Sequence, residues 1–295
     1  MSVLSIGSMN LDYVYQVPHL ARPGETLMAT AMETKAGGKG LNQTLALARA
    51  SATVRHAGCI GPEGAALRDL LVENGVDVSL VQTVEAPQGS AFIQVDQTTA
   101  QNSIVVFGGS NTALTPERVV EVLDSAQTGE RVLLQNEVSS MREILAGCAK
   151  RGLSVILNPA PYSDDIATMD LSSVEWLIVN EVEVEQLTGT NDPDEAWQIV
   201  QSRWPSTSLI VTLGEQGSVC FCQNERIVQE AYRVRAVDTT AAGDTFIGYF
   251  VAGLEKGLAL PQCLQQASLA SAIAVTRPGA APSIPWGKEL LGFDA

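Results

Sequence analysis

Short apolar runs alternate along this chain with longer stretches in which apolar residues recur at helical spacing. The short runs predict strands, and the longer stretches predict amphipathic helices. Strand, helix and strand in repetition predict an α/β protein, a three-layer αβα sandwich with a mainly parallel central sheet. The expected strands are Val3–Gly7, Thr53–Cys59, Val132–Gln135, Ser154–Leu157, Trp176–Val179 and Leu209–Thr212, and the expected helices include Leu41–Ala50, Glu63–Asn74, Pro116–Ala126 and Met141–Arg151. Since no fixed-period repeat or low-complexity linker interrupts the pattern, we expect residues 1–295 to form a single domain.

Two stretches have strand-like segments with no helix between them. Tyr13–Val17 and Thr26–Thr34 follow the first expected strand, and Ala91–Val95 and Ser103–Phe107 resemble a hairpin. We expect these segments, from about 12–34 and 91–107, to form a small β-strand lid over a binding cleft. An extension at the edge of the central sheet would explain the same pattern.

The C-terminal third is helical. Residues 242–256 and 261–276 are rich in Ala, Leu and Ile, and Pro261 stands where a helix N-terminus accepts proline. Their wide apolar faces predict that both helices pack deeply against the sheet.

Composition excludes some classes of function. The formal net charge is −15 over 295 residues, which disfavours binding to nucleic acid or to an anionic membrane. Five cysteines without a Cys-x-x-Cys and only two histidines favour structural thiols over a zinc site. The chain opens directly on a short apolar strand, so we expect neither a signal peptide nor a membrane span, and a cytoplasmic location.

The segment Asp238–Phe246 is the strongest chemical signal. An extended piece leads through the small residues Ala241, Ala242 and Gly243 into a helix, whose first N–H groups would form an anion site. Asp244 in the first turn could take a proton from an attacking hydroxyl. The alternative is that Asp244 only caps the helix.

Two further segments suit a polyol ligand. Asn10 and Asp12 follow the first strand, at the sheet edge where open α/β sheets bind ligands, although an Asx turn would explain them as well. The glycines around Gly38 and Lys39 permit close backbone approach, or they form a plain turn before a helix. They are not a phosphate-binding P-loop, because Lys39 is followed by Gly40.

Together these segments resemble the ribokinase/PfkB family of carbohydrate kinases. Asp238–Phe246 resembles its C-terminal signature and Ala36–Gln43 its N-terminal double-glycine signature. The family order also holds for Gly7–Asp12, Leu157–Pro161, Asn180–Glu183, Thr212–Gly217 and Thr276–Ala280, across almost the whole chain. The Gly-Gly-Lys-Gly-x-Asn-Gln segment and the Val-Thr-Arg-x-Gly-Ala-x-Pro-Ser tail resemble the family members that act on ribose.

The resemblance implies a role for each matching residue. It implies that Asp244 is the general base and that Ala241, Ala242 and Gly243 shape the anion hole. The implied sugar contacts are Asn10, Asp12, Gly38, Lys39, Asn42, Glu137 and Asp244. The implied ATP contacts are Asn180, Thr212, Gly214, Gly217, Gly243 and Ser268.

The resemblance also implies two ions. Glu183 would hold Mg²⁺ through water, which suits the preference of magnesium for keeping several waters. An activating K⁺ would lie in a loop made largely of backbone carbonyls, from Asp238, Thr240, Ala274, Arg277, Gly279 and Ser283.

The expected activity is transfer of the γ-phosphate of ATP to the 5-hydroxyl of D-ribose, in a homodimer formed through the lid. A kinase for deoxyribose, a ketose or a nucleoside is the alternative in the same class. A sugar- or nucleotide-sensing protein without catalysis is the alternative from another class, and it would not need Asp244. A nicotinamide dehydrogenase is disfavoured, since Gly7–Asp12 lacks Gly-x-Gly-x-x-Gly.

Overall fold

A nine-stranded, mainly parallel sheet runs through the part of the chain that the computed structural model describes, residues 2–99 and 101–293. Its spatial order is β13-β12-β11-β10-β9-β8-β1-β4-β5. Parallel pairing extends from β5 to β11, whereas β12 and β13 are antiparallel. The strands are β1 (Ser2–Ile6), β4 (Thr53–Ile60), β5 (Asp77–Thr83), β8 (Arg131–Gln135), β9 (Val155–Asn158), β10 (Val174–Asn180), β11 (Ser208–Thr212), β12 (Ser218–Cys222) and β13 (Glu225–Gln229).

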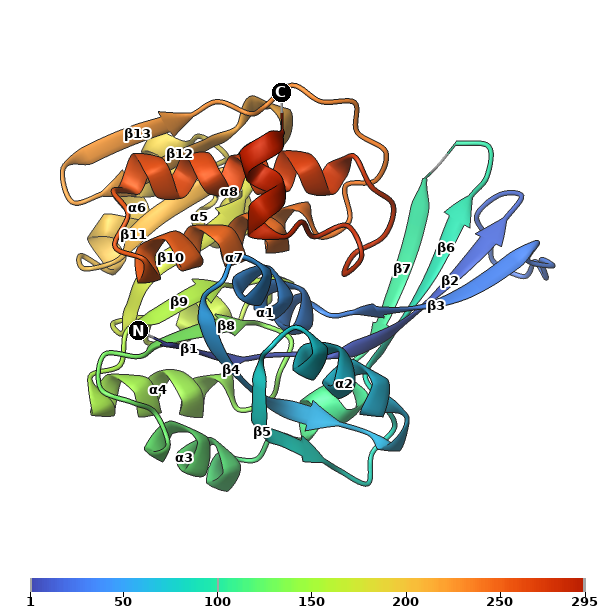
Figure 1. Cartoon of the computed structure of the whole chain (residues 1–295), viewed down its shortest axis with the longest axis horizontal. Helices are drawn as coiled ribbons and strands as arrows, with labels where there is room; N and C mark the ends of the chain where they lie inside the picture. Colours follow the sequence, from blue (N-terminus) through green and yellow to red (C-terminus); the bar gives the residue numbers. More distant parts are fainter. Residues whose placement is uncertain (1, 100, 294–295) are drawn as a thin grey trace.

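Helices cover both faces of this sheet and form the outer layers of the sandwich (Figure 1). One apolar core joins a sheet face to α1 (Lys39–Arg49), α2 (Ala65–Glu73), α7 (Ala242–Glu255) and α8 (Leu260–Val275). A second core joins the other face to α3 (Pro116–Asp124), α4 (Met141–Arg151), α5 (Glu181–Thr188) and α6 (Pro193–Arg203). Neighbouring residues of β1 show the division, because Val3 belongs to the first core and Leu4 to the second. The predicted three-layer αβα class is confirmed.

A second, four-stranded sheet projects from the sandwich (Figure 1). Its order is β3-β2-β6-β7, formed by β2 (Asn10–Val17), β3 (Ala31–Gly37), β6 (Ser90–Asp96) and β7 (Asn102–Phe107). The two expected stretches therefore lie outside the central sheet, as a lid, and do not extend its edge. We refer to these four strands as the lid.

Several expected boundaries shift. The strand predicted at Thr26–Thr34 was wrong: it runs instead from Ala31 to Gly37, because Asn10 to Gln16 of β2 pair with Gly37 to Ala31. The strands β5 and β13 and the helix α6 were not predicted. The polar edge strand Glu225–Gln229 explains one omission, since an edge strand lacks the continuous apolar run of a buried strand. No helix among the described residues is both long and apolar enough to cross a bilayer.

Candidate active site

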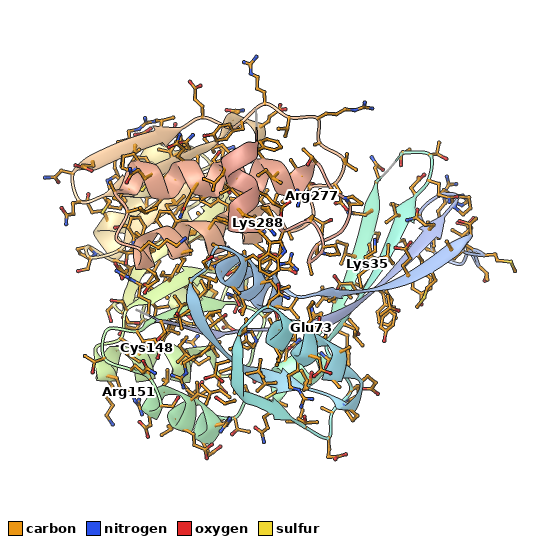
Figure 2. The ribbon with its side chains drawn as sticks, viewed as in Figure 1. Lys35, Glu73, Cys148, Arg151, Arg277 and Lys288 are labelled. Atoms are coloured by element: carbon orange, nitrogen blue, oxygen red, sulfur yellow. The ribbon has the colours of Figure 1, made fainter. Side chains whose placement is uncertain are left out.

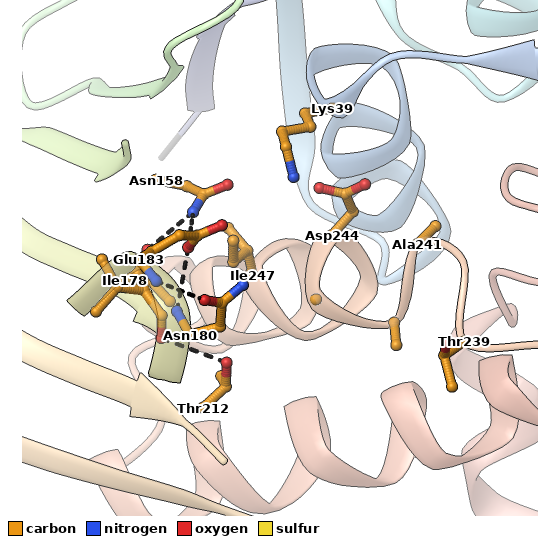
Figure 3. Close-up of a pocket in the computed structure, with 13 residues that line it drawn as sticks. Lys39, Asn158, Ile178, Asn180, Glu183, Thr212, Thr239, Ala241, Asp244 and Ile247 are labelled. Atoms are coloured by element: carbon orange, nitrogen blue, oxygen red, sulfur yellow. Dashed lines mark hydrogen bonds between the residues drawn. The ribbon is translucent and has the colours of Figure 1, made fainter. Parts of the chain in front are cut away.

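A cavity of about 210 Å³ lies beyond the carboxyl ends of the central strands. Lys39 of α1, Asn158 of β9 and Thr212 of β11 line it, together with the beginnings of α5 and α7 (Figure 3). Parallel strands place their carboxyl ends at one edge of the sheet, so residues far apart in sequence converge there. The structure thus brings together the expected Lys39, Asn180, Glu183, Thr212 and the Ala241–Asp244 segment.

The N-terminus of α7 presents its backbone to this cavity. Ala241 adopts a left-handed conformation with φ of 60°, which turns the chain into the helix. The Ala242 N–H donates to the Thr239 carbonyl at 3.2 Å. Apart from the neighbouring residues and the backbone of α7 itself, no heavy atom lies within 4 Å of the position that a Cβ on Gly243 would occupy. An anion can therefore approach the first turn of the helix closely.

Asp244 stands in that first turn, with its carboxylate buried and hydrogen-bonded at both oxygens. Its residue is 6% exposed, and its oxygens accept hydrogen bonds from Asn42 Nδ2 at 3.0 Å and from Gln43 Nε2 at 2.9 Å. Two amide donors leave lone pairs on each oxygen free for a further hydroxyl. Asn42 Oδ1 is itself buried without a hydrogen-bond partner among the described atoms, which suits a ligand hydroxyl.

Lys39 is the cation of the site. Its ammonium lies on the same side of the cavity as the Asp244 carboxylate (Figure 3). Burial opposes its charge, yet the carboxylates of Asp244, Glu137 and Glu183 outweigh burial and raise the pKa of Lys39 above its ordinary value. Lys39 therefore stays protonated and offers a positive charge next to the anion site.

The remaining carboxylates are held by neighbouring groups. Glu137 Oε2 accepts from Ser8 Oγ and from the Lys39 N–H at 3.0 Å, while desolvation raises the pKa of Glu137. Burial, reinforced by Glu137 and Asp244, raises the pKa of Asp12 to about 7. A Cβ on Gly37 would stand 2.0 Å from Asp12 Oδ2, so a larger residue there would displace this carboxylate.

Asn10 is the first residue of β2 and lies beside Gly38. Its Oδ1 accepts from Asn111 Nδ2 at 2.7 Å, and Asn111 Oδ1 accepts from the Met9 N–H at 3.0 Å. One lone pair of the Asn10 oxygen is thus used, and its amide N–H groups can donate to a ligand. Gly38, with φ of 92°, packs against the Asn10 backbone, where its glycine conformation is required.

Asn180 and Glu183 face the other side of the cavity. They form a capping box at the start of α5: Glu183 N–H donates to Asn180 Oδ1 at 2.8 Å, and Asn180 N–H donates to Glu183 Oε2 at 3.1 Å. Asn158 Nδ2 also donates to Glu183 Oε2, at 3.3 Å (Figure 3). Both side-chain hydrogen bonds to Glu183 use Oε2, and Oε1 takes part in neither. A single carboxylate in a polar cavity suits an ion held mainly by water and phosphate.

A second cavity of about 410 Å³ lies between the lid and the loops before α7 and after α8. Thr239 lines both cavities, so both border the loop that precedes α7. Asp12, Ile93 and Ile104 line it from one face of the lid. Lys35 also lines it from β3 (Figure 2). A space with one polar end and an apolar lid wall fits a small polyol.

Asp238 ties two segments of this second cavity together. Burial would raise its pKa, but hydrogen bonds from Thr240 and from the Gly279 N–H outweigh burial and lower the pKa of Asp238. The bonds are 2.9 Å from Thr240 N, 2.6 Å from Thr240 Oγ1 and 2.8 Å from Gly279 N. Three expected cation-loop residues are therefore adjacent.

Other expected residues lie apart from the two cavities. Gly217 packs against β13, where a Cβ would stand 2.0 Å from the Gln229 carbonyl oxygen, and Ser268 donates to the Glu230 carbonyl at 3.4 Å. Arg277 pairs with Glu289 at 2.6 Å. Neither cavity is lined by Gly214, Gly217, Ser268, Ala274, Arg277 or Ser283. Four expected sugar contacts, Asn10, Gly38, Asn42 and Glu137, also line neither cavity.

Sequence reasoning missed four polar residues that organise the site: Ser8, Gln43, Asn111 and Asn158. Gln43 and Asn158 were visible within quoted motifs, but nothing in the sequence assigned a partner to either side chain. Asn111 follows the lid strand β7 and had no signal in the sequence.

Known proteins resemble this chain along its whole length. The sequence profile described as "pfkB family carbohydrate kinase" matches residues 1–287. A ribokinase of Haemophilus influenzae is 36% identical over 98% of this chain and 96% of its own, and one of Staphylococcus aureus is 37% identical over 98% of each. A solved structure of Arabidopsis thaliana ribokinase complexed with ribose and ATP is 31% identical, covers 99% of both chains and has a TM-score of 0.83.

Proposed function

Because this chain belongs to the pfkB family of carbohydrate kinases, we propose that it transfers the γ-phosphate of ATP to the 5-hydroxyl of D-ribose. The relatives named as ribokinases, at 36 and 37% identity, support ribose as the sugar. A structural relative complexed with ribose and ATP supports the same pair of substrates.

One observation carries the proposal: Asp244 is a buried carboxylate in the first turn of α7, beside the anion site at that helix's N-terminus. Its carboxylate is fixed by Asn42 and Gln43, and the open backbone at Gly243 lies one residue away. A hydroxyl next to Asp244 can give up its proton while the phosphoryl group at the helix N-terminus is stabilised. A sensing protein would have no use for this pairing of base and anion hole.

The ATP phosphates enter the cavity of about 210 Å³ in this account. Lys39 and the N–H groups of Gly243 and Asp244 contact the transferred phosphoryl group, and Asn180 and Thr212 lie on the nucleotide side. Magnesium, when bound, neutralises the phosphate charge, and Glu183 would hold it through water. Gly214, Gly217 and Ser268 do not line this cavity. They would contact the nucleotide only where it extends past β11.

The sugar occupies the junction between the two cavities. Asn10, Asp12, Gly38, Asn42 and Glu137 supply donors and acceptors for its hydroxyls. The apolar lid residues of the second cavity cover it and exclude water, which would otherwise take the phosphoryl group.

A potassium ion bound near Asp238 would stabilise the loop that leads into α7. Support comes from the contact between the two segments: Asp238 accepts from Gly279 N–H at 2.8 Å, and Val237 N–H donates to the Val275 carbonyl at 2.7 Å. The expected ligand atoms are oxygens, mostly backbone carbonyls, which suit a hard cation. They come from Thr240, Ala274, Arg277, Gly279 and Ser283.

The chain forms one domain, and two copies join through their lids. Register places Tyr13, Phe92 and Val105 side by side on the lid face opposite Asp12, and Tyr13 stacks on Phe92 at 5.3 Å. Phe92 and Val105 are 46% and 65% exposed. Such an apolar patch favours a covering partner, and a second lid has the matching surface.

The test is a coupled assay of ADP formation by the purified protein with D-ribose, 2-deoxyribose, fructose, inosine or no acceptor. We expect the highest kcat/KM with D-ribose and little ADP formation without an acceptor. A higher kcat/KM with another acceptor would reassign the substrate, and ADP formation with none of them would refute the kinase proposal.

A further inference from the structure

Three buried amide side chains form a hydrogen-bonded row behind Asp244. We call Gln135, Gln43 and Asn158 the amide row, from the end of β8 through α1 to the end of β9. Gln135 Nε2 donates to Gln43 Oε1 at 2.6 Å, and Gln43 Nε2 donates to Asn158 Oδ1 at 3.3 Å as well as to Asp244 Oδ1 at 2.9 Å. Gln135 and Gln43 are 0% exposed and Asn158 is 5% exposed, so water does not compete for these groups.

A backbone carbonyl fixes the direction of every amide in the row. Asn158 Nδ2 donates to the Ile178 carbonyl at 3.0 Å, and a carbonyl can only accept. The Asn158 oxygen must therefore face Gln43, and Gln43 must present its NH₂ group. Reversal of Gln43 would set its oxygen against both Asn158 Oδ1 and the Asp244 carboxylate.

Asn42, the other partner of Asp244, lacks this constraint. Its Oδ1 has no partner among the described atoms, so Asn42 can turn toward a ligand. The Gln43 donor therefore holds Asp244 whether or not the sugar is bound. Hydrogen bonds to an ionised carboxylate stabilise the charged form, which is the form a base needs.

We propose that Gln43 is a positioning residue for phosphoryl transfer: its directed amide holds the Asp244 carboxylate turned toward the acceptor hydroxyl. This inference rests on the proposed kinase function, in which Asp244 is the base. Gln43 acts through Asp244 rather than by contact with the sugar.

Other charged groups surround Asp244. Asp12 from β2, Glu137 after β8 and Lys39 from α1 interact with it electrostatically, and Glu183 from α5 interacts with Lys39. No hydrogen bond joins any of these four side chains to Gln43 among the described contacts. Their electrostatic effect on the site should therefore be shared by the wild type and by a control variant that spares Gln43.

The test compares Gln43→Met with Thr44→Val in the full chain. Thr44 is the next residue of α1 and equally buried, but it bonds Ser5 and His56 and not Asp244. The readouts are kcat and KM for ribose against pH at saturating ATP, with melting temperatures beside them. In Gln43→Met we expect kcat to fall about 10- to 100-fold, as for loss of a hydrogen bond to a charged group.

The split between kcat and KM separates positioning from packing. In Gln43→Met, KM for ribose should stay within about threefold of wild type at every pH while kcat falls. Thr44→Val should lower the melting temperature and leave kcat within about twofold of wild type. A kcat within about twofold of wild type in folded Gln43→Met would overturn the inference.

A second variant covers the case in which Gln43→Met does not fold. Gln43→Glu keeps the shape, but it removes the donor and puts a second carboxyl beside Asp244. We therefore expect kcat to fall at least as far as in Gln43→Met, with KM for ribose again within about threefold of wild type. A wild-type kcat in folded Gln43→Glu would equally refute the proposal. Failure of the kinase function itself is distinguishable, since the wild-type protein would then form no ribose-dependent ADP.

Discussion

Asp244→Asn is the most informative single change, because it removes the base while keeping its shape. The neighbours of Asp244 are both donors: Asn42 Nδ2 at 3.0 Å and Gln43 Nε2 at 2.9 Å. An asparagine has one oxygen and one NH₂ group, so one of these donors loses its acceptor. The Gln43 amide is fixed by the amide row, whereas Asn42 has a free oxygen and can turn to accept.

The fold should therefore tolerate the substitution. We expect the oxygen of the new asparagine to face Gln43 and its NH₂ group to face a reversed Asn42. The free energy of unfolding should then fall by no more than about 1 kcal/mol, less than the loss of a buried hydrogen bond. The rate should fall about 10²- to 10⁴-fold, because general-base catalysis is lost. That loss corresponds to about 3–5 kcal/mol of activation free energy.

Calorimetric titration of ribose and ATP, beside steady-state rates, gives both halves of this prediction. Dissociation constants should stay within about tenfold of wild type, or about 1.4 kcal/mol, while kcat falls. The matched control is Asp192→Asn, since Asp192 caps α6 by accepting from the Asp194 and Glu195 N–H groups at 2.9 Å and lines neither cavity. Near-wild-type turnover in folded Asp244→Asn would refute the reasoning and leave Asp244 as a cap.

Four further predictions concern the surroundings of the site. Asp12 has a folded-state pKa of about 7, above its ordinary value of 3.8, so the folded protein holds a proton that the unfolded chain releases. Stability should therefore fall as pH rises from about 4 to about 7, and Asp12→Asn should flatten this dependence in chemical denaturation. Gly37→Ala should raise KM for ribose at least about tenfold, because its Cβ would stand 2.0 Å from Asp12 Oδ2, whereas Gly292→Ala, with open space, should not. Potassium should raise kcat over sodium-only buffer, and equal rates would contradict a cation loop. Val105→Asp should convert a dimer to monomers in sedimentation experiments, and a wild-type monomer at micromolar concentration would exclude the lid interface.

The central sheet could be predicted because its strands are short apolar runs buried on both faces. Trp176–Val179 and Leu209–Thr212 carry this signal, and their predicted ends lie within two residues of the observed ends of β10 and β11. The register of the lid could not be predicted in the same way. β3 begins at Ala31 because of its pairing with β2, and its polar residues Glu33 to Lys35 show no clean alternation.

The site divides in a similar way. Asp244 and Lys39 stand in short segments whose glycines and helix starts are visible locally, so sequence indicated them. The contact between Gln43 and Asp244 joins residues 201 positions apart, and it depends on how α1 packs beside α7. The orientation of the Asn158 amide is set by its hydrogen bond to the Ile178 carbonyl on a neighbouring strand. Such partners arise only once the sheet is assembled.

Identification of the product tests the central claim most directly. The protein, ATP, magnesium and D-ribose are incubated together, and the product is analysed by proton–phosphorus correlation NMR. The account predicts a new phosphomonoester whose phosphorus couples to the two C5 protons of ribose, formed in step with ADP. ADP with free phosphate and no ester, or an ester coupled to a different ribose carbon, would contradict it.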